Sequence, residues 1–135
     1  MGNEEMYMRS ELYRELADPI IIKKCSHLLD AGISVDFVAS QKQKKVGKEK
    51  IVLAECKKVQ EFYKLYCPFD FIIVIYELNC EGLSNEQMKI LIWHELEHIG
   101  IDPETGEFYV KPHDVEEFDD IINAHGLHWQ EVDNG

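Results

Sequence analysis

The sequence lacks an apolar run long enough to cross a membrane, which requires about 18 consecutive apolar residues. Its longest apolar stretch, from Phe71 to Tyr76, has the length of a buried strand. The N-terminus is acidic and polar, unlike a secretory signal, and Met6 stands where an N-myristoylation motif needs Ser or Thr. We therefore expect a cytoplasmic protein with no membrane partner.

Paired cysteine motifs are also missing from the chain. The four cysteines are scattered with no C-x-x-C pair: Cys25, Cys56, Cys67 and Cys80. In a chain without an export signal, this spacing indicates reduced and mostly buried thiols. We expect neither disulfides nor metal ligands from them.

Positive charge is scarce and unevenly distributed. The chain has 14 Lys and Arg against 26 Asp and Glu, a formal net charge of -12. From Asp102 to the end there are ten acidic residues and one lysine, so this part should repel phosphate backbones. The one basic run, Lys42 to Lys50, predicts a solvated hairpin tip, with nucleic acid or an acidic partner as the alternative contact. Nucleic acid is therefore not the expected partner, and the oligomeric state is left open.

The remaining composition is typical of a globular domain. With 135 residues, of which 45% are hydrophobic, the chain can bury a core without cross-links. We predict a single domain over residues 1–135. The expected class is α+β, with a small, mostly antiparallel sheet packed on a central helix between N-terminal and C-terminal helices.

The first half of the chain predicts two helices followed by a hairpin. A short helix is expected near Ser10 to Ala17, after which Asp18-Pro19 has the form of an N-cap followed by proline at the first helical position. This second helix ends at Gly32. Ile33–Ser40 and Lys50–Cys56 are β-prone and are joined by the lysine-rich loop, which predicts a β-hairpin.

One helix is specified more strongly than any other element. Ser84 and Gln87 form the pattern of a capping box at its start, and Gly100 with Pro103 predicts its end. Its residues are apolar on most sides, which predicts a central, buried helix. The apolar positions are Met88, Ile90, Leu91, Ile92, Trp93, Leu96 and Ile99.

Four other segments surround this helix. Lys57–Tyr66 is compatible with a short helix or with an extension of the preceding strand, and Phe69–Glu77 is the strongest strand. After the helix, Phe108–Val110 is predicted to be extended. A last helix should begin near Pro112 to Asp114 and end at Gly126.

The central helix carries a motif with the spacing of metal ligands. His94 and His98 are four residues apart, so both imidazoles should leave the same face of the helix, one turn apart. That separation suits two ligands of one tetrahedral Zn²⁺. Glu95 lies beside them, where its carboxylate can take a proton from water at the metal without binding the metal itself. Two histidines and two glutamates would be costly to bury in an apolar helix without such a partner.

The third protein ligand is less strongly specified. The metzincin pattern would place a histidine at position 104, where the sequence has Glu104. His113 is the preferred candidate because it follows a turn that can fold back over the metal. Glu117 is the alternative ligand, and it is also the natural capping-box partner of Asp114.

Three stretches of this chain together resemble the family of putative phage metallopeptidases, short zincin-like proteins of phages and of the bacterial genomes that host them. They are the Phe69 strand running into His94-Glu95-Leu96-Glu97-His98, then Lys111-Pro112-His113-Asp114-Val115-Glu116-Glu117-Phe118, and finally His125-Gly126-Leu127-His128-Trp129. The resemblance implies a zincin-like fold, a metal ligand at His113, and the cytoplasm of a bacterial host or phage-infected cell. More distantly, the chain is similar to minimal SprT-like proteases, which act on DNA-bound proteins.

The predicted activity is zinc-dependent hydrolysis of a peptide or protein substrate, with Glu95 as general base. The Phe69–Glu77 strand could bind an extended substrate by strand addition if it lies at a sheet edge, whereas an interior position would make it a core strand. Candidates to stabilise the oxyanion are Tyr109, His125 and His128. For His125 a packed position is the preferred interpretation, because it shares a helical face with apolar residues.

Two other functions are weighed against the peptidase. An SprT-like, DNA-associated protease would need a basic surface, which only Lys42 to Lys50 supplies. A non-catalytic zinc-binding phage or prophage protein would need the two histidines but would gain nothing from Glu95. Imidazole ligands also suit metals other than zinc.

Overall fold

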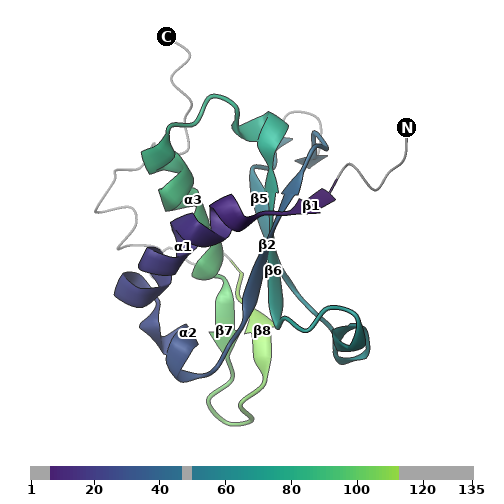
Figure 1. Ribbon diagram of the computed structural model, residues 1–135. Coiled ribbons are helices and arrows are strands. Elements are labelled where there is room, and N and C mark those ends of the chain that lie inside the picture. Colours follow the sequence, from purple (N-terminus) through teal and green to yellow (C-terminus); the bar gives the residue numbers. More distant parts are fainter. Residues whose placement is uncertain (1–6, 47–49, 113–135) are drawn as a thin grey trace.

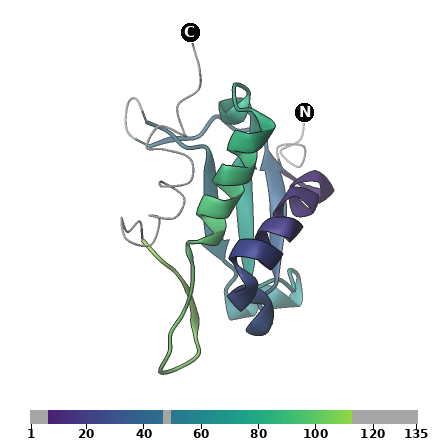
Figure 2. The ribbon, with the colours of Figure 1, turned by 90° about the vertical axis from the view of Figure 1, so that its left-hand side faces the viewer.

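The computed structural model describes residues 7–46 and 50–112, which form an α+β fold with helices on one face of a mixed sheet (Figures 1 and 2). The predicted last helix, from about residue 112 to Gly126, lies outside the described residues except for its first position. No helix among the described residues has the length and apolar character needed to cross a membrane.

The main sheet has four strands in the order β1-β2-β6-β5. Their bounds are Tyr7–Arg9 for β1, Val35–Ser40 for β2, Phe71–Tyr76 for β6 and Ala54–Lys58 for β5. β1 and β2 are antiparallel, β2 and β6 are parallel, and β6 and β5 are antiparallel. The sheet is therefore mixed, with two of its three pairings antiparallel, in keeping with the predicted mostly antiparallel sheet.

The predicted hairpin between Ile33–Ser40 and Lys50–Cys56 is wrong, because β6 separates β2 from β5. The lysine-rich segment instead forms its own two-stranded pair, β3 (Lys45–Val46) with β4 (Lys50–Ile51). The physical reason lies in β6, whose six residues are all apolar or aromatic and bury both faces of the strand. Such a strand is most stable in the middle of a sheet, so its edge is not open to a substrate.

The N-terminal helices differ from the prediction in where they break. α1 runs without interruption from Glu11 to Lys24, and the Ser10 hydroxyl caps it by accepting the Tyr13 N–H at 3.2 Å. Pro19 lies inside this helix, and the break falls at Cys25, before α2 (Ser26–Asp30). Continuous packing of one face on the core outweighs the missing proline N–H. The residues of that face are Tyr13, Leu16, Ala17, Ile20 and Ile21.

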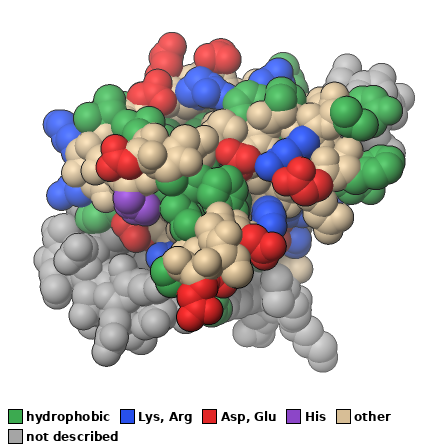
Figure 3. All heavy atoms as spheres, turned by 90° about the horizontal axis from the view of Figure 1, so that it is seen from below, with side chains coloured by type: hydrophobic (Ala, Val, Ile, Leu, Met, Phe, Trp, Pro, Cys, Tyr) green, Lys and Arg blue, Asp and Glu red, His purple; other side chains and the backbone are tan. Residues whose placement is uncertain are grey.

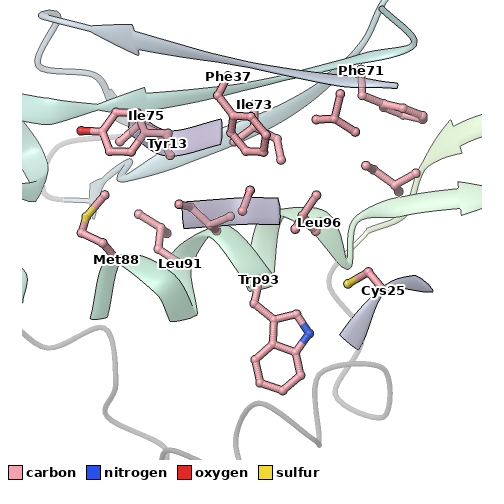
Figure 4. Close-up of a cluster of buried hydrophobic side chains, with 14 of the residues drawn as sticks. Tyr13, Cys25, Phe37, Phe71, Ile73, Ile75, Met88, Leu91, Trp93 and Leu96 are labelled. Atoms are coloured by element: carbon pink, nitrogen blue, oxygen red, sulfur yellow. The ribbon is translucent and has the colours of Figure 1, made fainter. Parts of the chain in front are cut away.

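The core lies between the sheet and α1 and α3 (Figure 4). Phe37, Phe71, Ile73 and Ile75 point from β2 and β6 toward the helices, and Leu91 and Leu96 of α3 point back at them. Because neighbouring strand residues alternate, the other face of the sheet carries Val74 and Tyr76 of β6. The helix that bears the histidine motif is thus fixed against the most apolar strand.

α3 spans Asn85–Leu96 and starts with the predicted capping box. The Gln87 N–H donates to the Ser84 hydroxyl at 3.2 Å, and the Ser84 N–H donates to the Gln87 side chain at 2.9 Å. The predicted end at Gly100 is wrong, since the helix stops at Leu96 with Glu97 as its C-cap. Ile99–Ile101 forms β7 instead, because it pairs along its length with β8.

The other short elements complete the fold. β8 is Phe108–Val110, as predicted. Lys57–Tyr66 combines both expected forms, since its first two residues extend β5 and Glu61–Leu65 forms the 3-10 helix η2. A second 3-10 helix, η3, spans Glu77–Cys80. Apolar side chains are exposed on and beside η2, at the right of Figure 3: Phe62, Tyr63, Leu65 and Tyr66.

Removing the cap of α3 should destabilise the fold. Ser84→Ala deletes the acceptor for the Gln87 N–H, and we expect it to lower the free energy of unfolding by about 1 kcal/mol. Ser26→Ala is the matched control, because Ser26 begins α2 without serving as its cap. Urea denaturation followed by circular dichroism measures both, and equal stability of the two variants would contradict this role.

Candidate metal centre

His94, Glu95 and His98 meet at the C-terminal end of α3. His94 and Glu95 belong to its last turn, and His98 lies in the turn immediately after it. Their potential ligand atoms all lie within 4.8 Å of one another. The two imidazole rings are 5.2 Å apart between centroids, with 74° between their planes. Although α3 ends at Leu96, before His98, the side chains of the two histidines converge as predicted.

All three side chains are buried, with exposed fractions of 8% for His94, 6% for Glu95 and 7% for His98. Burying three such groups together in an apolar setting is unfavourable unless hydrogen bonds or a cation compensate. A divalent cation would interact favourably with two neutral imidazoles and a carboxylate in this position. The burial that the sequence predicted for this motif is confirmed.

His98 is oriented by the chain that follows β8. Its Nδ1 lies 2.6 Å from the Lys111 carbonyl oxygen, which can only accept a hydrogen bond. Nδ1 therefore carries the proton, and Nε2 is the ring nitrogen whose lone pair can coordinate a metal. In return, the Lys111 N–H donates to the His98 carbonyl at 2.6 Å. These two bonds fix both the ring and its backbone.

Gly100 makes this approach possible, a role that the sequence did not reveal. A Cβ at Gly100 would lie 2.6 Å from Cζ of Tyr109 and 2.8 Å from Cγ of Lys111, which is closer than carbon atoms pack. Because Gly100 has no side chain, the side chains of Tyr109 and Lys111 can pass close over β7, and Lys111 can lie beside His98. The structure places Tyr109 here, 43% exposed, and not among the described residues that line the cleft next to the histidines.

Glu97, the other carboxylate of the motif, is turned toward different partners. It accepts a hydrogen bond from the Trp93 indole at 3.0 Å, and the Cys25 thiol lies 3.9 Å from the same oxygen. These contacts hold Glu97 against the junction of α1 and α2. Of the two glutamates, only Glu95 belongs to the cluster with the histidines.

A cleft of about 240 Å³ opens beside the cluster. Its lining comes from three parts of the chain: Ala54 to Lys57 of β5, Val110 and Lys111 at the end of β8, and Glu95 and His98 of the cluster. Among the described strands β5 pairs only with β6, and the residues from Ala54 to Lys57 of this edge strand line the cleft.

The environment of Glu95 favours its protonated form. Burial, and secondarily the nearby Glu55 carboxylate, raise the pKa of Glu95 from 4.5 to about 7. Burial would also raise the pKa of Glu55. Hydrogen bonds that Glu55 accepts from Lys44 at 2.7 Å and from Tyr76 at 2.5 Å outweigh this effect, so the pKa of Glu55 is lowered. A negative charge thus stays fixed near Glu95. A single glutamate in a β-prone segment gave no sequence signal for this role.

Cys56 also lies near Glu95, on the face of β5 that packs toward the core. Burial and the charge of Glu95 raise the pKa of its thiol to about 12. Cys56 is therefore protonated at neutral pH in the metal-free protein. All four cysteines are free, as expected, although only Cys25 and Cys80 are fully buried.

The remaining candidate residues lie outside the described part of the chain. These are the proposed third ligand and its alternative, and two of the three candidates for the oxyanion: His113, Glu117, His125 and His128. The described chain ends at Pro112, directly after Lys111, which contacts His98. The described donors already fit a metal: one imidazole has a fixed tautomer, and a second imidazole and a carboxylate converge with it.

The pKa of Glu95 predicts a pH dependence of stability in chelator-treated protein. The folded chain binds this proton more tightly than the unfolded chain, so the stabilisation is complete below about pH 4.5 and lost as the pH rises toward 7. Relative to Glu95→Gln, the wild type should lose about 3 kcal/mol of unfolding free energy across this window. Urea titrations at several pH values measure the difference, and a constant difference would contradict the assignment.

Comparison with known proteins agrees with this site. The family described as "Putative phage metallopeptidase" matches residues 5–134, which is nearly the whole chain. No curated protein and no solved structure matches the chain significantly. The match spans the strands of the sheet, the histidine motif and the segment after β8. The chain belongs to the putative phage metallopeptidase family.

Proposed function

We propose that the protein is a zinc-dependent metallopeptidase whose metal is held by His94, His98 and His113, with Glu95 as general base. The observation that carries this proposal is the buried convergence of two imidazoles and one carboxylate at the end of a cleft. Membership of a family named for metallopeptidases supports it. His113 as third ligand is supported by its position two residues after Lys111, which contacts His98.

Zinc suits this donor set better than a hard cation such as Mg²⁺, because the described site offers two neutral nitrogen donors. When bound, zinc supplies a Lewis acid that acidifies water and polarises a carbonyl group. The protein supplies the orientation: the Lys111 carbonyl holds His98 in the tautomer whose Nε2 can coordinate.

Glu95 is suited to moving a proton. It lies beside both imidazoles, and it lines the cleft that a substrate would enter. Its carboxylate accepts the proton of the attacking water and then gives it to the leaving amine nitrogen. A site that served only to stabilise the fold would have no use for a buried carboxylate aimed at the cleft.

The substrate would bind along β5. Strand addition at the Phe69–Glu77 strand is excluded because β6 has neighbours on both sides, whereas among the described strands β5 has a neighbour on one side only, and its residues line the cleft. An extended peptide can add its backbone to that edge, with a scissile carbonyl near Glu95 and His98. We therefore propose β5, and not β6, as the strand to which the substrate adds.

The test is cleavage of an unfolded protein by zinc-loaded wild type and by Glu95→Gln. We expect the variant to retain one zinc ion per chain and to lose at least about 100-fold in activity, because it cannot accept the proton. Glu86→Gln is the matched control, since Glu86 is exposed on the same helix, and it should cleave like the wild type.

Two outcomes would count against the proposal. If Glu95→Gln cleaves as fast as the wild type, Glu95 is not the general base. If the wild type binds zinc, unfolds when zinc is chelated, and cuts no substrate, then the site stabilises the fold and the protein is a non-catalytic zinc-binding module.

A further inference from the structure

A second hollow lies on the face of the sheet that is turned away from the helices. It encloses about 630 Å³ and is bordered by residues from β1, from the segment after β2, and from β5 and β6. We call it the lysine groove and define it by Lys42, Lys44, Lys57, Tyr7 and Tyr76. Nothing in the proposed catalytic chemistry uses these lysines.

The lysine groove and the cleft of the candidate active site share one lining residue. Lys57 borders both the groove and the cleft that contains Glu95. Glu55 and Lys57 are two residues apart on β5, so both point to the same face, and Glu55 is opposite Val74, two residues before Tyr76. A chain that lies along the edge of β5 would therefore pass the cleft and the groove together.

The positive groups of the groove are held in place. The Lys42 ammonium lies 5.2 Å from the centre of the Tyr7 ring, and that of Lys44 lies 5.9 Å from the Tyr76 ring. Lys44 also contacts Glu55 at 2.7 Å, whereas Lys57 is farther from Glu55, at 3.9 Å.

The backbone beneath these lysines is anchored as well. The Asn79 side-chain amide donates to the carbonyl of Lys44 at 3.0 Å and to that of Val52 at 2.8 Å. Asn79 thereby ties the lysine-rich segment to η3, which follows β6 directly. The groove is a built surface rather than a flexible run of lysines.

Charge determines what the groove can attract. Among the described residues three lysines and no carboxylate line the groove. Two carboxylates contact its lining, Glu55 through Lys44 and Lys57 and Glu77 through Gln41, so the described lining carries a surplus of positive charge. Among the described residues Lys42 forms no ion pair, and Lys57 is exposed. In a chain of net charge -12, this local excess would draw in an anionic group.

We propose that the lysine groove binds an acidic side chain of the peptide substrate and so sets the cleavage preference. This rests on the proposed peptidase function. A peptide added to the β5 edge points alternate side chains to the two faces of the sheet. Those on the outer face would lie next to Lys57 and point toward the groove that Lys42 borders from the side of β1, so Asp or Glu is preferred at one or two alternate positions on one side of the scissile bond.

A peptide fits the lysine groove better than a nucleic acid does. Binding of a nucleic acid relies on several phosphate contacts along a positive track. Here the excess charge of the described lining belongs to a groove that shares Lys57 with the catalytic cleft, in a strongly acidic protein.

The experiment is cleavage of a peptide library prepared from a bacterial proteome, with cut sites identified by mass spectrometry. Wild-type protein should enrich Asp and Glu at one or two alternate positions. Lys42→Gln and Lys57→Gln should each lower that enrichment about fivefold, the effect expected for one partly exposed ion pair. Cleavage of neutral peptides by Lys42→Gln should persist, because Lys42 lies outside the cleft.

Lys58→Gln is the matched control, since Lys58 is exposed on the same strand but does not border the groove. It should keep the wild-type preference. If the wild type shows no enrichment of acidic residues, or if the enrichment survives both substitutions, the proposed role of the groove is wrong. The proposed peptidase function is not affected by either result. If no cleavage depends on Glu95, the peptidase fails and the groove's role fails with it.

Binding separates the peptide from a nucleic acid independently of turnover. Zinc-loaded Glu95→Gln is titrated with a fluorescent acidic peptide and with a single-stranded DNA oligonucleotide. We expect salt-sensitive binding of the peptide that weakens in the added Lys42→Gln background. If the oligonucleotide binds in a Lys42-dependent way and the acidic peptide does not, the proposal is wrong.

Discussion

Two hydrogen bonds between His98 and Lys111 connect the parts of the candidate site. One fixes the tautomer of the imidazole, and the other joins the turn after α3 to the end of β8. Together they hold Lys111 in the lining of the cleft that β5 also borders. Gly100 permits this contact because it has no side chain where Tyr109 and Lys111 cross. The site thus depends on a close approach of backbone segments as much as on the identity of the histidines.

The same arrangement explains how three polar side chains can be buried in an apolar core. α3 packs against β6 and against α1 through large apolar residues, which hold its C-terminal end in the interior. His94, Glu95 and His98 are then confined to the one place where the core meets the cleft. The burial of the three side chains and their position beside the cleft are thus consequences of one packing arrangement.

Local signals were sufficient to predict the parts of the fold that depend on neighbouring residues. The capping box at Ser84 and the pairing of His94 with His98 both involve residues close in sequence. The capping box is confirmed, and the two imidazoles converge although His98 lies just beyond the end of the helix. Long-range pairing was not predictable in this way. Nothing in the lysine-rich loop shows that β6 will insert between the two strands that it joins, and nothing near Glu55 shows that it will face Glu95.

The convergence of His94 and His98 on one metal ion is the central claim, and a calorimetric zinc titration of metal-free protein tests it most directly. The account predicts one zinc ion per chain, a loss of affinity above about 100-fold for His98→Ala, and no change for the exposed His27→Ala. His113→Ala should weaken binding far more than Glu117→Ala. Absence of stoichiometric binding, or equal affinity of His98→Ala and His27→Ala, would contradict it.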